Sequence, residues 1–326
     1  MPLFTPMPAS LLPRPLRALS TLALALSLGA CAYMPQLQGL NDMQAHRHAN
    51  SKGGTTEALA SVRERPELLV AVTPSNQLIT FNAGEPGKIL SRVPIKGLLP
   101  AESLLAIDFQ VAKGQLFGLS SLGRLLKINS QTVEATPVGS PLSLPPGQTY
   151  GFNFNPTVDR IRLVSDQGHN LRLHPDTGAQ VDGDPKLPGI QPDGMLAYGT
   201  GDLLSNTKPR IVAVAYTYNK VDEKITTNYA IDAGAGYLAV QGSVEGASPV
   251  VSPSTGKLQA IGPLLIDRFD TAALDISDLN NTAYLVTNRN AGGDSKLYEV
   301  NLASGQARLI GAIGGGEPVR GMAIIP

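Results

Sequence analysis

The fold is decided by a short strand sequence, LAIDF at residues 105–109, which returns in altered form about every 45 residues along the chain. Each copy is followed by further short runs of Val, Ile, Leu and Tyr, separated by Gly, Asn, Asp, Ser and Pro. Short strands with this spacing are typical of β-propeller blades. The copies are LAIDF at 105–109, YGFNF at 150–154, GMLAY at 194–198, AALDI at 272–276 and GMAII at 321–325.

The two ends of the repeat predict how the ring closes. We call the repeated strand sequence the first element of a unit and the runs that follow it the second, third and fourth elements. The first blade begins with its second, third and fourth elements, at 68–72, 77–81 and 88–93. Its missing first element has a counterpart at the other end, where a lone first element lies at 319–325. We therefore expect an all-β domain over residues 66–326: a five-bladed β-propeller whose C-terminal strand joins the N-terminal blade and leaves no long sheet edge exposed. The long fourth unit keeps six blades open, and a β-sandwich or two-domain β protein is the structural alternative.

Composition excludes several classes of function. The 326 residues carry 26 Lys and Arg against 26 Asp and Glu, a net charge of zero. Because nucleic-acid binding needs a basic surface that displaces counterions, we expect no nucleic-acid partner. The single cysteine excludes an intramolecular disulfide and a Cys-based zinc site.

That cysteine ends a segment typical of a secretory signal. Arg14 and Arg17 precede an apolar stretch at 18–28, which is too short for a lasting membrane span. The sequence LGAC at 28–31 resembles the bacterial lipobox, which implies cleavage after residue 30 and a lipid anchor at Cys31. By the same resemblance, Ala32 in place of Asp favours the outer membrane, with the periplasmic face and the cell surface both open. We predict a lipoprotein signal peptide at 1–30 and a lipidated Cys with a flexible tether at 31–65, which is rich in Gln, Asn, Gly, Ser and Thr.

One long run is distinctive enough to indicate a family. The sequence GFNFNPTVDRIRLVSD at 151–166, continued by QGHNLRLHPDTG at 167–178, resembles the hallmark of the bacterial domain-of-unknown-function 4394 family. The similarity extends over about residues 66–326. It implies a propeller-like β domain, often in exported proteins, and no particular activity. The family position matching Asn153 is commonly Asp, so this chain departs from the pattern there.

The same run holds the densest charge cluster of the domain. Arg160 and Arg162 lie two apart on one predicted strand and therefore share a face. Paired guanidinium groups suit a carboxylate or phosphate, which predicts a small anionic ligand. The alternative is an Asp, Arg and Asn network that fixes turns and holds neighbouring sheets together. The candidate ligand-binding residues are Asp159, Arg160, Arg162, Asp166, Asn170 and Arg172.

A second candidate site lies on the first elements. Their alignment puts Asp108, Asn153, Ala197, Asp275 and Ala323 at one level near the central channel. Two carboxylates and an amide, Asp108, Asn153 and Asp275, offer oxygen ligands to Ca²⁺. The alternative is a set of small polar residues lining a hydrated channel, and we expect no other cofactor.

No catalytic residue is predicted. The sequence contains no Gly-x-Ser-x-Gly elbow, cysteine nucleophile in the domain, or phosphate-binding glycine loop. We therefore expect a cell-envelope lipoprotein with a non-enzymatic binding or scaffolding propeller, whose partner is an envelope protein or a small anionic ligand. The alternative is an envelope hydrolase or lactonase-like enzyme with a metal in the central channel.

Overall fold

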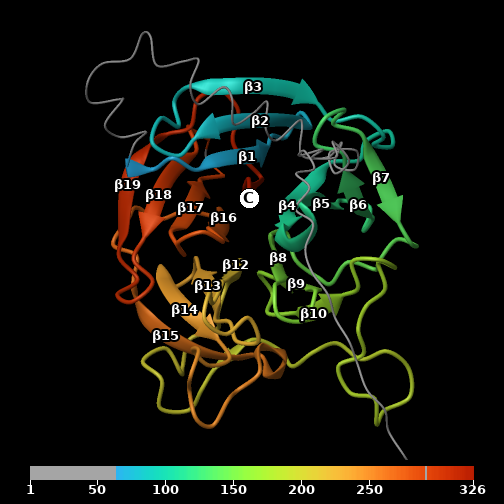
Figure 1. The fold of residues 1–326 in the computed structure, drawn as a ribbon. Coiled ribbons are helices and arrows are strands. Elements are labelled where there is room, and N and C mark those ends of the chain that lie inside the picture. Colours follow the sequence, from blue (N-terminus) through green and yellow to red (C-terminus); the bar gives the residue numbers. More distant parts are fainter. Residues whose placement is uncertain (1–63, 291) are drawn as a thin grey trace, which may run out of the picture. The chain divides into compact units, whose positions relative to one another are not determined.

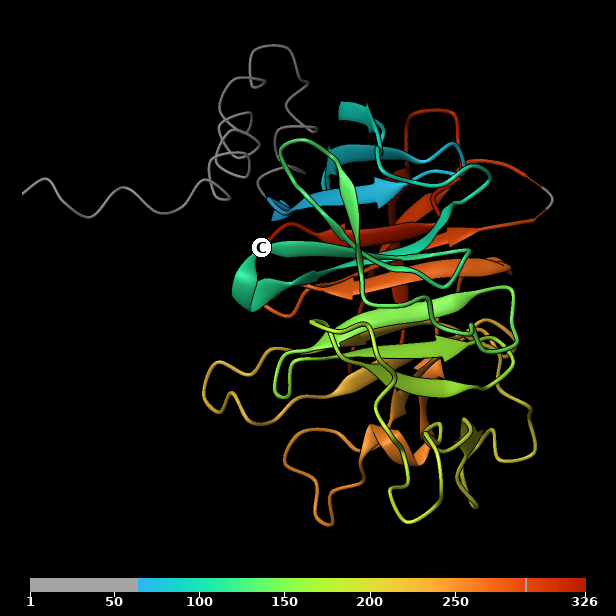
Figure 2. The ribbon, with the colours of Figure 1, turned by 90° about the vertical axis from the view of Figure 1, so that its right-hand side faces the viewer.

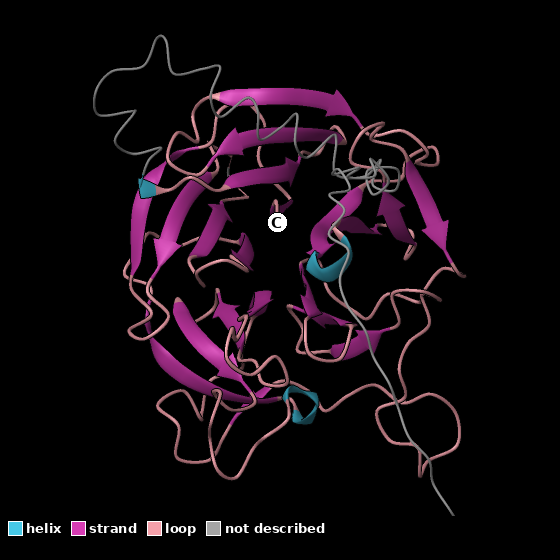
Figure 3. Cartoon of the chain, in the orientation of Figure 1, coloured by secondary structure: helices cyan, strands magenta, loops and turns pink. Residues whose placement is uncertain are grey.

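The computed structural model describes residues 64–290 and 292–326, and these form five β-sheets around a central channel (Figures 1 and 3). Apart from Glu64, which is helical, helical structure in these residues is limited to two 3₁₀ turns, η1 (Val111–Lys113) and η2 (Pro253–Thr255). The predicted five-bladed propeller is confirmed, and the six-bladed and β-sandwich alternatives are wrong. No helix in the described part of the chain is long and apolar enough to cross a membrane.

Blades 1, 2 and 5 are four-stranded antiparallel sheets. From the channel outward, blade 1 contains β20 (Gly321–Ile324), β1 (Leu68–Val72), β2 (Gln77–Asn82) and β3 (Ile89–Pro94). Blade 2 contains β4 (Leu104–Gln110), β5 (Gln115–Ser120), β6 (Leu125–Ile128) and β7 (Ala135–Val138). Blade 5 contains β16 (Thr271–Ile276), β17 (Ala283–Asn288), β18 (Lys296–Val300) and β19 (Ala307–Ala312).

Blades 3 and 4 depart from this plan. Blade 3 contains β8 (Tyr150–Asn155), β9 (Arg160–Ser165) and β10 (Asn170–Leu173). Blade 4 contains β12 (Ile211–Tyr216), β13 (Asn228–Asp232), β14 (Tyr237–Gln241), β15 (Lys257–Pro263) and β11 (Ala197–Tyr198), which pairs parallel to β15 at the outer edge. In blade 3 the outer edge of β10 is covered by an irregular segment, in which the Val181 N–H donates to the Arg172 carbonyl at 2.7 Å.

The assignment of the first element in blade 4 was wrong. The sequence GMLAY at 194–198 resembles an inner strand, but its residues end in the outermost strand, β11, where Ala197 is exposed. The inner strand is β12, and all six of its residues are buried. An inner strand has neighbouring blades on both faces, so it requires the continuous apolar run IVAVAY that β12 supplies.

The ring closes as the ends of the repeat predicted. The last strand, β20, pairs antiparallel with β1, with Ile324 opposite Leu69 and Gly321 opposite Val72. The Ile325 N–H continues the ladder by donating to the Leu68 carbonyl at 2.9 Å. Blade 1 is therefore built from both ends of the described chain.

The hydrophobic core lies between neighbouring sheets, and its side chains become smaller toward the axis of the propeller. Phe117 of blade 2 packs on Phe154 of blade 3, with ring centroids 5.1 Å apart. Nearer the axis the inner strands carry Ala or Gly, and a Cβ on Gly151 would lie 2.9 Å from the Val214 nitrogen of the next blade. The pocket between the inner strands at this level has a volume of about 20 Å³, too little for more than a water molecule. The channel is therefore closed at one end by close-packed strands.

Candidate functional site at the channel mouth

Above the closed end, three polar side chains form a ring on the inner strands. Asp108 lies on β4, Asn153 on β8 and Asp275 on β16, and all three are buried. The sequence placed Ala197 at the same level, but β12 supplies Ala215 instead, because β11 lies at the outer edge. The predicted grouping of Asp108, Asn153 and Asp275 holds in the structure.

Each of these side chains holds the inner strand of the next blade. The Asp108 carboxylate accepts a hydrogen bond from the Phe154 N–H at 2.7 Å, and the Asn153 carbonyl oxygen accepts one from the Tyr216 N–H at 2.9 Å. Asp275 closes the circle by accepting from the Ile324 N–H at 2.7 Å. The ring therefore satisfies buried backbone donors that would otherwise lack partners.

The two positions with alanine are compensated by the aspartates. Ala323 comes before Asp108 around the ring, and Ala215 comes before Asp275, so neither blade receives a side-chain acceptor from its predecessor. Asp275 instead accepts from its own neighbouring Ile276 N–H at 2.8 Å, and Asp108 likewise accepts from the Phe109 N–H. Three side chains thus serve the amides of all five inner strands.

Burial makes the charged form of this ring unfavourable. It raises the pKa of Asp108 well above its ordinary value, and the nearby Asp275 carboxylate adds to the effect. Burial also raises the pKa of Asp275 to about 7. Asn153 lies between the two and donates from Nδ2 to the Asp275 Oδ1 at 3.3 Å. The channel therefore favours the protonated, neutral form of these carboxyl groups.

The ring matches a calcium site in only part of its chemistry. Ca²⁺ takes six to eight oxygen ligands, whereas this level offers two carboxylates and one amide, whose oxygens face N–H donors. Within residues 64–290 and 292–326, no three His, Cys, Asp or Glu side chains gather in a metal-binding arrangement. The metal at Asp108, Asn153 and Asp275 stays a prediction.

A pocket of about 430 Å³ opens where the inner strands end. Its walls come from four blades: η1 after β4, the β8–β9 hairpin, the segment 217–227 after β12, and the β16–β17 hairpin. Phe154, Tyr218 and Ile225 provide apolar surface, while Lys113 and Glu223 are among the charged residues of the wall. The pocket therefore combines apolar and charged surface directly above the ring of Asp108.

Tyr218 is the residue of this pocket that the sequence did not reveal. Its backbone is fixed by Asn281, which accepts from the Tyr218 N–H at 2.8 Å and donates to the Tyr218 carbonyl at 2.9 Å. Burial, followed by the carboxylates of Asp108 and Asp275, raises the pKa of the phenol. The hydroxyl makes no hydrogen bond to any residue that the structure describes. It is therefore a neutral donor available to a ligand.

The segment that carries Tyr218 is held by Glu245 from the β14–β15 connection. The Asn219 Nδ2 donates to the Glu245 carboxylate at 2.6 Å, Thr217 also donates to it, and the Glu245 N–H donates to Thr227 at 2.9 Å. These contacts join both ends of segment 217–227 to one residue, one end through the Glu245 side chain and the other through its backbone. The pocket wall is thus positioned by hydrogen bonds and has no regular secondary structure of its own.

The predicted charge cluster is divided between three places. Asp159 lies at the pocket, where it accepts from Gln110 Nε2 at 2.6 Å and faces the Lys113 ammonium at 3.5 Å. Arg160 donates to the carbonyls of Val158 and Asp159. Asp166 accepts from the Gln148 N–H at 3.0 Å, in the hairpin at the opposite end of β9. These residues do not form one site with the remaining three.

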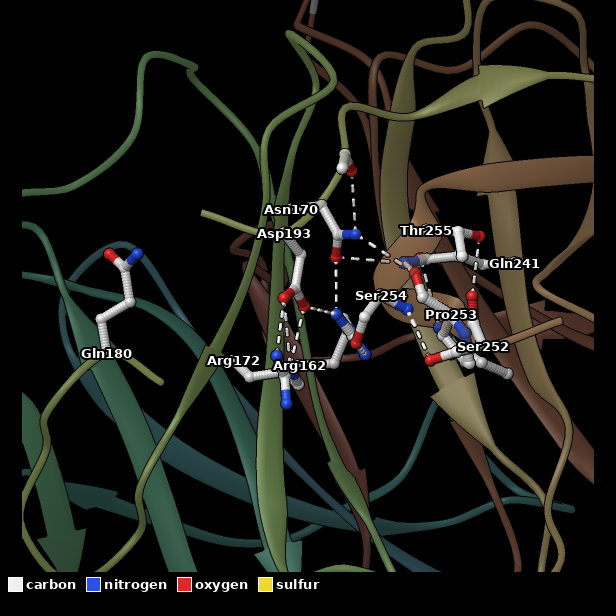
Figure 4. Close-up of polar contacts among 12 residues, drawn as sticks. Arg162, Asn170, Arg172, Gln180, Asp193, Gln241, Ser252, Pro253, Ser254 and Thr255 are labelled. Atoms are coloured by element: carbon white, nitrogen blue, oxygen red, sulfur yellow. Dashed lines mark hydrogen bonds and ion pairs between the residues drawn. The ribbon is translucent and has the colours of Figure 1, made fainter. Parts of the chain in front are cut away.

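The other three candidates meet around Asp193, a residue that sequence reasoning missed (Figure 4). Arg162 donates to the Asp193 carboxylate at 2.6 Å and to the Asn170 oxygen at 2.8 Å, and Arg172 binds both Asp193 oxygens, at 2.8 and 2.9 Å. Only 3% of the Arg162 surface is exposed. Its anionic partner is thus a carboxylate of the same chain.

The Arg162 network links two blades. The Arg162 guanidinium, on β9 of blade 3, also donates to the Tyr216 hydroxyl at 3.2 Å and to Ser254 at 3.3 Å, both in blade 4. Gln241 of β14 donates to the Asn170 oxygen at 3.1 Å. Asp193 lies in the irregular connection between β10 and β11, so no strand pattern marked it in the sequence.

Comparison with known proteins identifies a family. Residues 77–323 match the model of a family described as a domain of unknown function, DUF4394. No curated protein sequence matches the chain.

Solved structures with a similar arrangement are distant in sequence. They include a nidogen/laminin complex, with 11% identity over 80% of this chain and 98% of the other, at a TM-score of 0.45. They also include a structural genomics protein of unknown function from Bacteroides thetaiotaomicron VPI-5482, with 12% identity over 74% and 56%, at 0.42. A third is YCF48 bound to D1 peptide, with 10% identity over 74% and 62%, at 0.33.

Proposed function

The chain belongs to the DUF4394 family, and we propose that it is a cell-envelope lipoprotein whose propeller binds or scaffolds a partner at the channel mouth. The observation that supports this function is the pocket of about 430 Å³, which four blades build over a channel closed beneath it. Its volume falls in the range of small-molecule sites, roughly 300–1,000 Å³. A ligand at this place would rest on the ring of Asp108, Asn153 and Asp275 and could not pass through the propeller.

The pocket residues suit a small polar ligand or a side chain of a partner protein. The Tyr218 hydroxyl offers a hydrogen-bond donor, and Lys113 and Lys220 offer positive charge to an anionic group. Phe154 and Ile225 offer apolar surface beside them. This combination of apolar surface with a few polar groups is typical of binding sites.

The anchor is the second part of the proposal. The signal peptide at 1–30, Cys31 and nearly all of the 31–65 tether lie outside the described residues. In the proposed arrangement Cys31 carries acyl chains, which hold the protein on the outer membrane and leave the propeller on the aqueous side. Flotation of the chain with membranes, lost in Cys31→Ser, tests this part.

Binding at the pocket is tested by crosslinking in the cell. A photoreactive amino acid replaces Ile225, which lines the pocket, or Leu122, which lies in the β5–β6 hairpin at the other end of the blades. We expect a defined adduct at Ile225 only, which is lost when Ala112→Trp fills the pocket. Equal adducts at both positions, or an adduct unaffected by Ala112→Trp, would contradict the proposal.

The alternative function is an envelope hydrolase or lactonase-like enzyme with a channel metal. The observation in its favour is the pair of neighbouring buried carboxylates, Asp108 and Asp275, which a cation would stabilise in the charged form. Metal analysis of the purified chain and a panel of ester and lactone substrates distinguish the two functions. A stoichiometric metal together with turnover would favour the enzyme.

A further inference from the structure

Four exposed aliphatic side chains lie on three of the loops that supply the walls of the pocket. Val221 is 97% exposed, Leu279 67%, Val158 56% and Ile225 37%. Single exposed aliphatic residues are ordinary on protein surfaces. Here four of them gather on three loops that border one pocket, which is typical of an interaction surface. We call these four residues the aliphatic rim.

The aliphatic rim lies on one face of the propeller. Its residues follow the C-terminal ends of the inner strands β8, β12 and β16, which run in the same direction along the channel. Figure 2 shows these loops at the left, together with the C-terminus and the beginning of β1. We call this side the pocket face.

The N-terminal part of the chain joins the propeller on the pocket face. Glu67, just before β1, accepts hydrogen bonds from Asn280 Nδ2 at 2.9 Å and from the Tyr284 hydroxyl at 2.8 Å. Asn280 is the neighbour of Leu279 in the β16–β17 hairpin. The described chain therefore enters β1 beside the β16–β17 hairpin, which carries Leu279.

The charges around the aliphatic rim balance. The loops at 111–114, 156–160, 217–227 and 277–282 contain four cationic and four anionic side chains. A basic surface would favour anionic lipids, and an acidic one would be repelled by them. A balanced surface with projecting aliphatic groups suits zwitterionic headgroups, between which apolar side chains can insert.

We propose that the pocket face rests on a lipid bilayer, with Val221, Leu279 and Val158 inserted at the level of the headgroups. This docking presupposes the proposed lipid anchor at Cys31, which brings the pocket face to the membrane. The pocket then opens toward the bilayer, so its ligand is a molecule or protein segment that the membrane itself presents.

The chain contains no tryptophan, so a single introduced tryptophan reports its own surroundings without background. The probes are Val221→Trp and Leu279→Trp on the aliphatic rim, and the control is Leu122→Trp. Leu122 lies in the β5–β6 hairpin; Ser120 pairs with Leu104 at the start of β4, which places this hairpin at the opposite end of the blade. All three positions are exposed, so the fold should tolerate each change.

The experiment uses the full lipidated chain in vesicles of zwitterionic phospholipid with brominated acyl chains. We expect strong quenching and a blue shift at Val221→Trp and Leu279→Trp, and neither at Leu122→Trp. Raising the salt concentration should leave the quenching unchanged, because the surrounding charges balance.

The outcomes separate docking from anchoring. A chain that floats with the vesicles but shows no quenching at Val221→Trp rejects the docking and leaves the anchor intact. A wild-type chain that does not float rejects the anchor. Equal quenching at all three positions, or a blue shift without lipid that grows with protein concentration and so reports a second copy on this face, would also overturn the docking.

Discussion

At the residue scale, the ring of Asp108, Asn153 and Asp275 shows how one side chain can serve two purposes. Asp275 accepts from an amide of its own strand and from an amide of the next blade, so it satisfies backbone donors and joins sheets. Asp108 acts in the same way toward Phe109 and Phe154. Both side chains are buried carboxyl groups whose pKa is raised, so the protonation of this ring depends on pH.

The first prediction concerns that sensitivity. The pKa of Asp275 rises from 3.8 to about 7 on folding, and that of Asp108 also rises, so the folded chain binds more protons than the unfolded chain between these values. The stabilisation that this ring provides should therefore be full below about pH 4, decrease from there, and be lost as pH rises through 7, by on the order of 4 kcal/mol for Asp275. Urea denaturation at a series of pH values measures the decline.

Variants of Asp108 and Asp275 test whether this ring causes the fall in unfolding free energy with rising pH. Asp275→Asn should lower stability at acidic pH, because one amide loses its acceptor, and should flatten the dependence on pH. Asp159→Asn, at the pocket wall and outside the channel, is the control and should keep the full decline. An unchanged slope in both Asp275→Asn and Asp108→Asn would contradict the prediction.

The sequence repeat predicted the ring of Asp108, Asn153 and Asp275, because these residues occupy equivalent positions on repeated strands. The repeat alone put Asp108, Asn153 and Asp275 at one level, and only Ala197 was wrong, because GMLAY at 194–198 resembles an inner strand. Tyr218 and Asp193 could not be found in this way. Both lie in connections without a repeat, and their positions depend on hydrogen bonds to distant residues such as Asn281 and Arg172.

At the scale of elements, β9 and β10 place two arginines directly opposite each other. Arg162 pairs in register with Arg172, an arrangement that would be destabilising without a counter-charge. Asp193 supplies that charge from the irregular β10–β11 connection and binds both guanidinium groups. The connection therefore substitutes for the missing fourth strand in holding blade 3 to blade 4.

The second prediction concerns the contacts that Asp193 makes with the two arginines. Asp193→Ala should lower the free energy of unfolding by about 3–5 kcal/mol, because it leaves the Arg162 guanidinium buried without its carboxylate. The double variant with Arg172→Met should regain part of the loss. Chemical denaturation at neutral pH gives both values.

The matched control is an ion pair on the surface. Asp267 faces Lys296 at 3.2 Å with 79% of its side chain exposed, so Asp267→Ala should change stability by less than about 1 kcal/mol. If Asp193→Ala were no more harmful than Asp267→Ala, the network would not hold the blades together. The sequence predicted that Arg160 and Arg162 share a face, but it could not show that Asp193 completes the network.

At the scale of the whole molecule, closure of the ring depends on close contact between the last strand and blade 2. A Cβ on Gly321 would lie 2.9 Å from the Ala106 Cα and 2.9 Å from the Ile107 nitrogen, both on β4. Because backbone atoms lie on the other side, a larger residue must push two blades apart. The order of elements at the ends of the chain predicted this closure, since it depends only on counting strands.

The third prediction tests the contact. Gly321→Ala should lower the free energy of unfolding by about 1–3 kcal/mol, as expected for overpacking. Gly199→Ala is the matched control, because a Cβ at Gly199 would meet nothing within 4 Å. Thermal unfolding of the two variants is compared with the unchanged chain, and equal midpoints for both would show that the blades can separate freely at this contact.

The pairing of β20 with β1 also sets the order in which the protein can be completed. A ribosome makes β1 before the strands of blades 2 to 5, and it makes β20 after them. Until that strand has emerged, the inner edge of blade 1 is unpaired, and Asp275 lacks the hydrogen bond that the Ile324 N–H donates to it. The nascent chain can form blades 2 to 5 in succession, but the finished ring waits for β20.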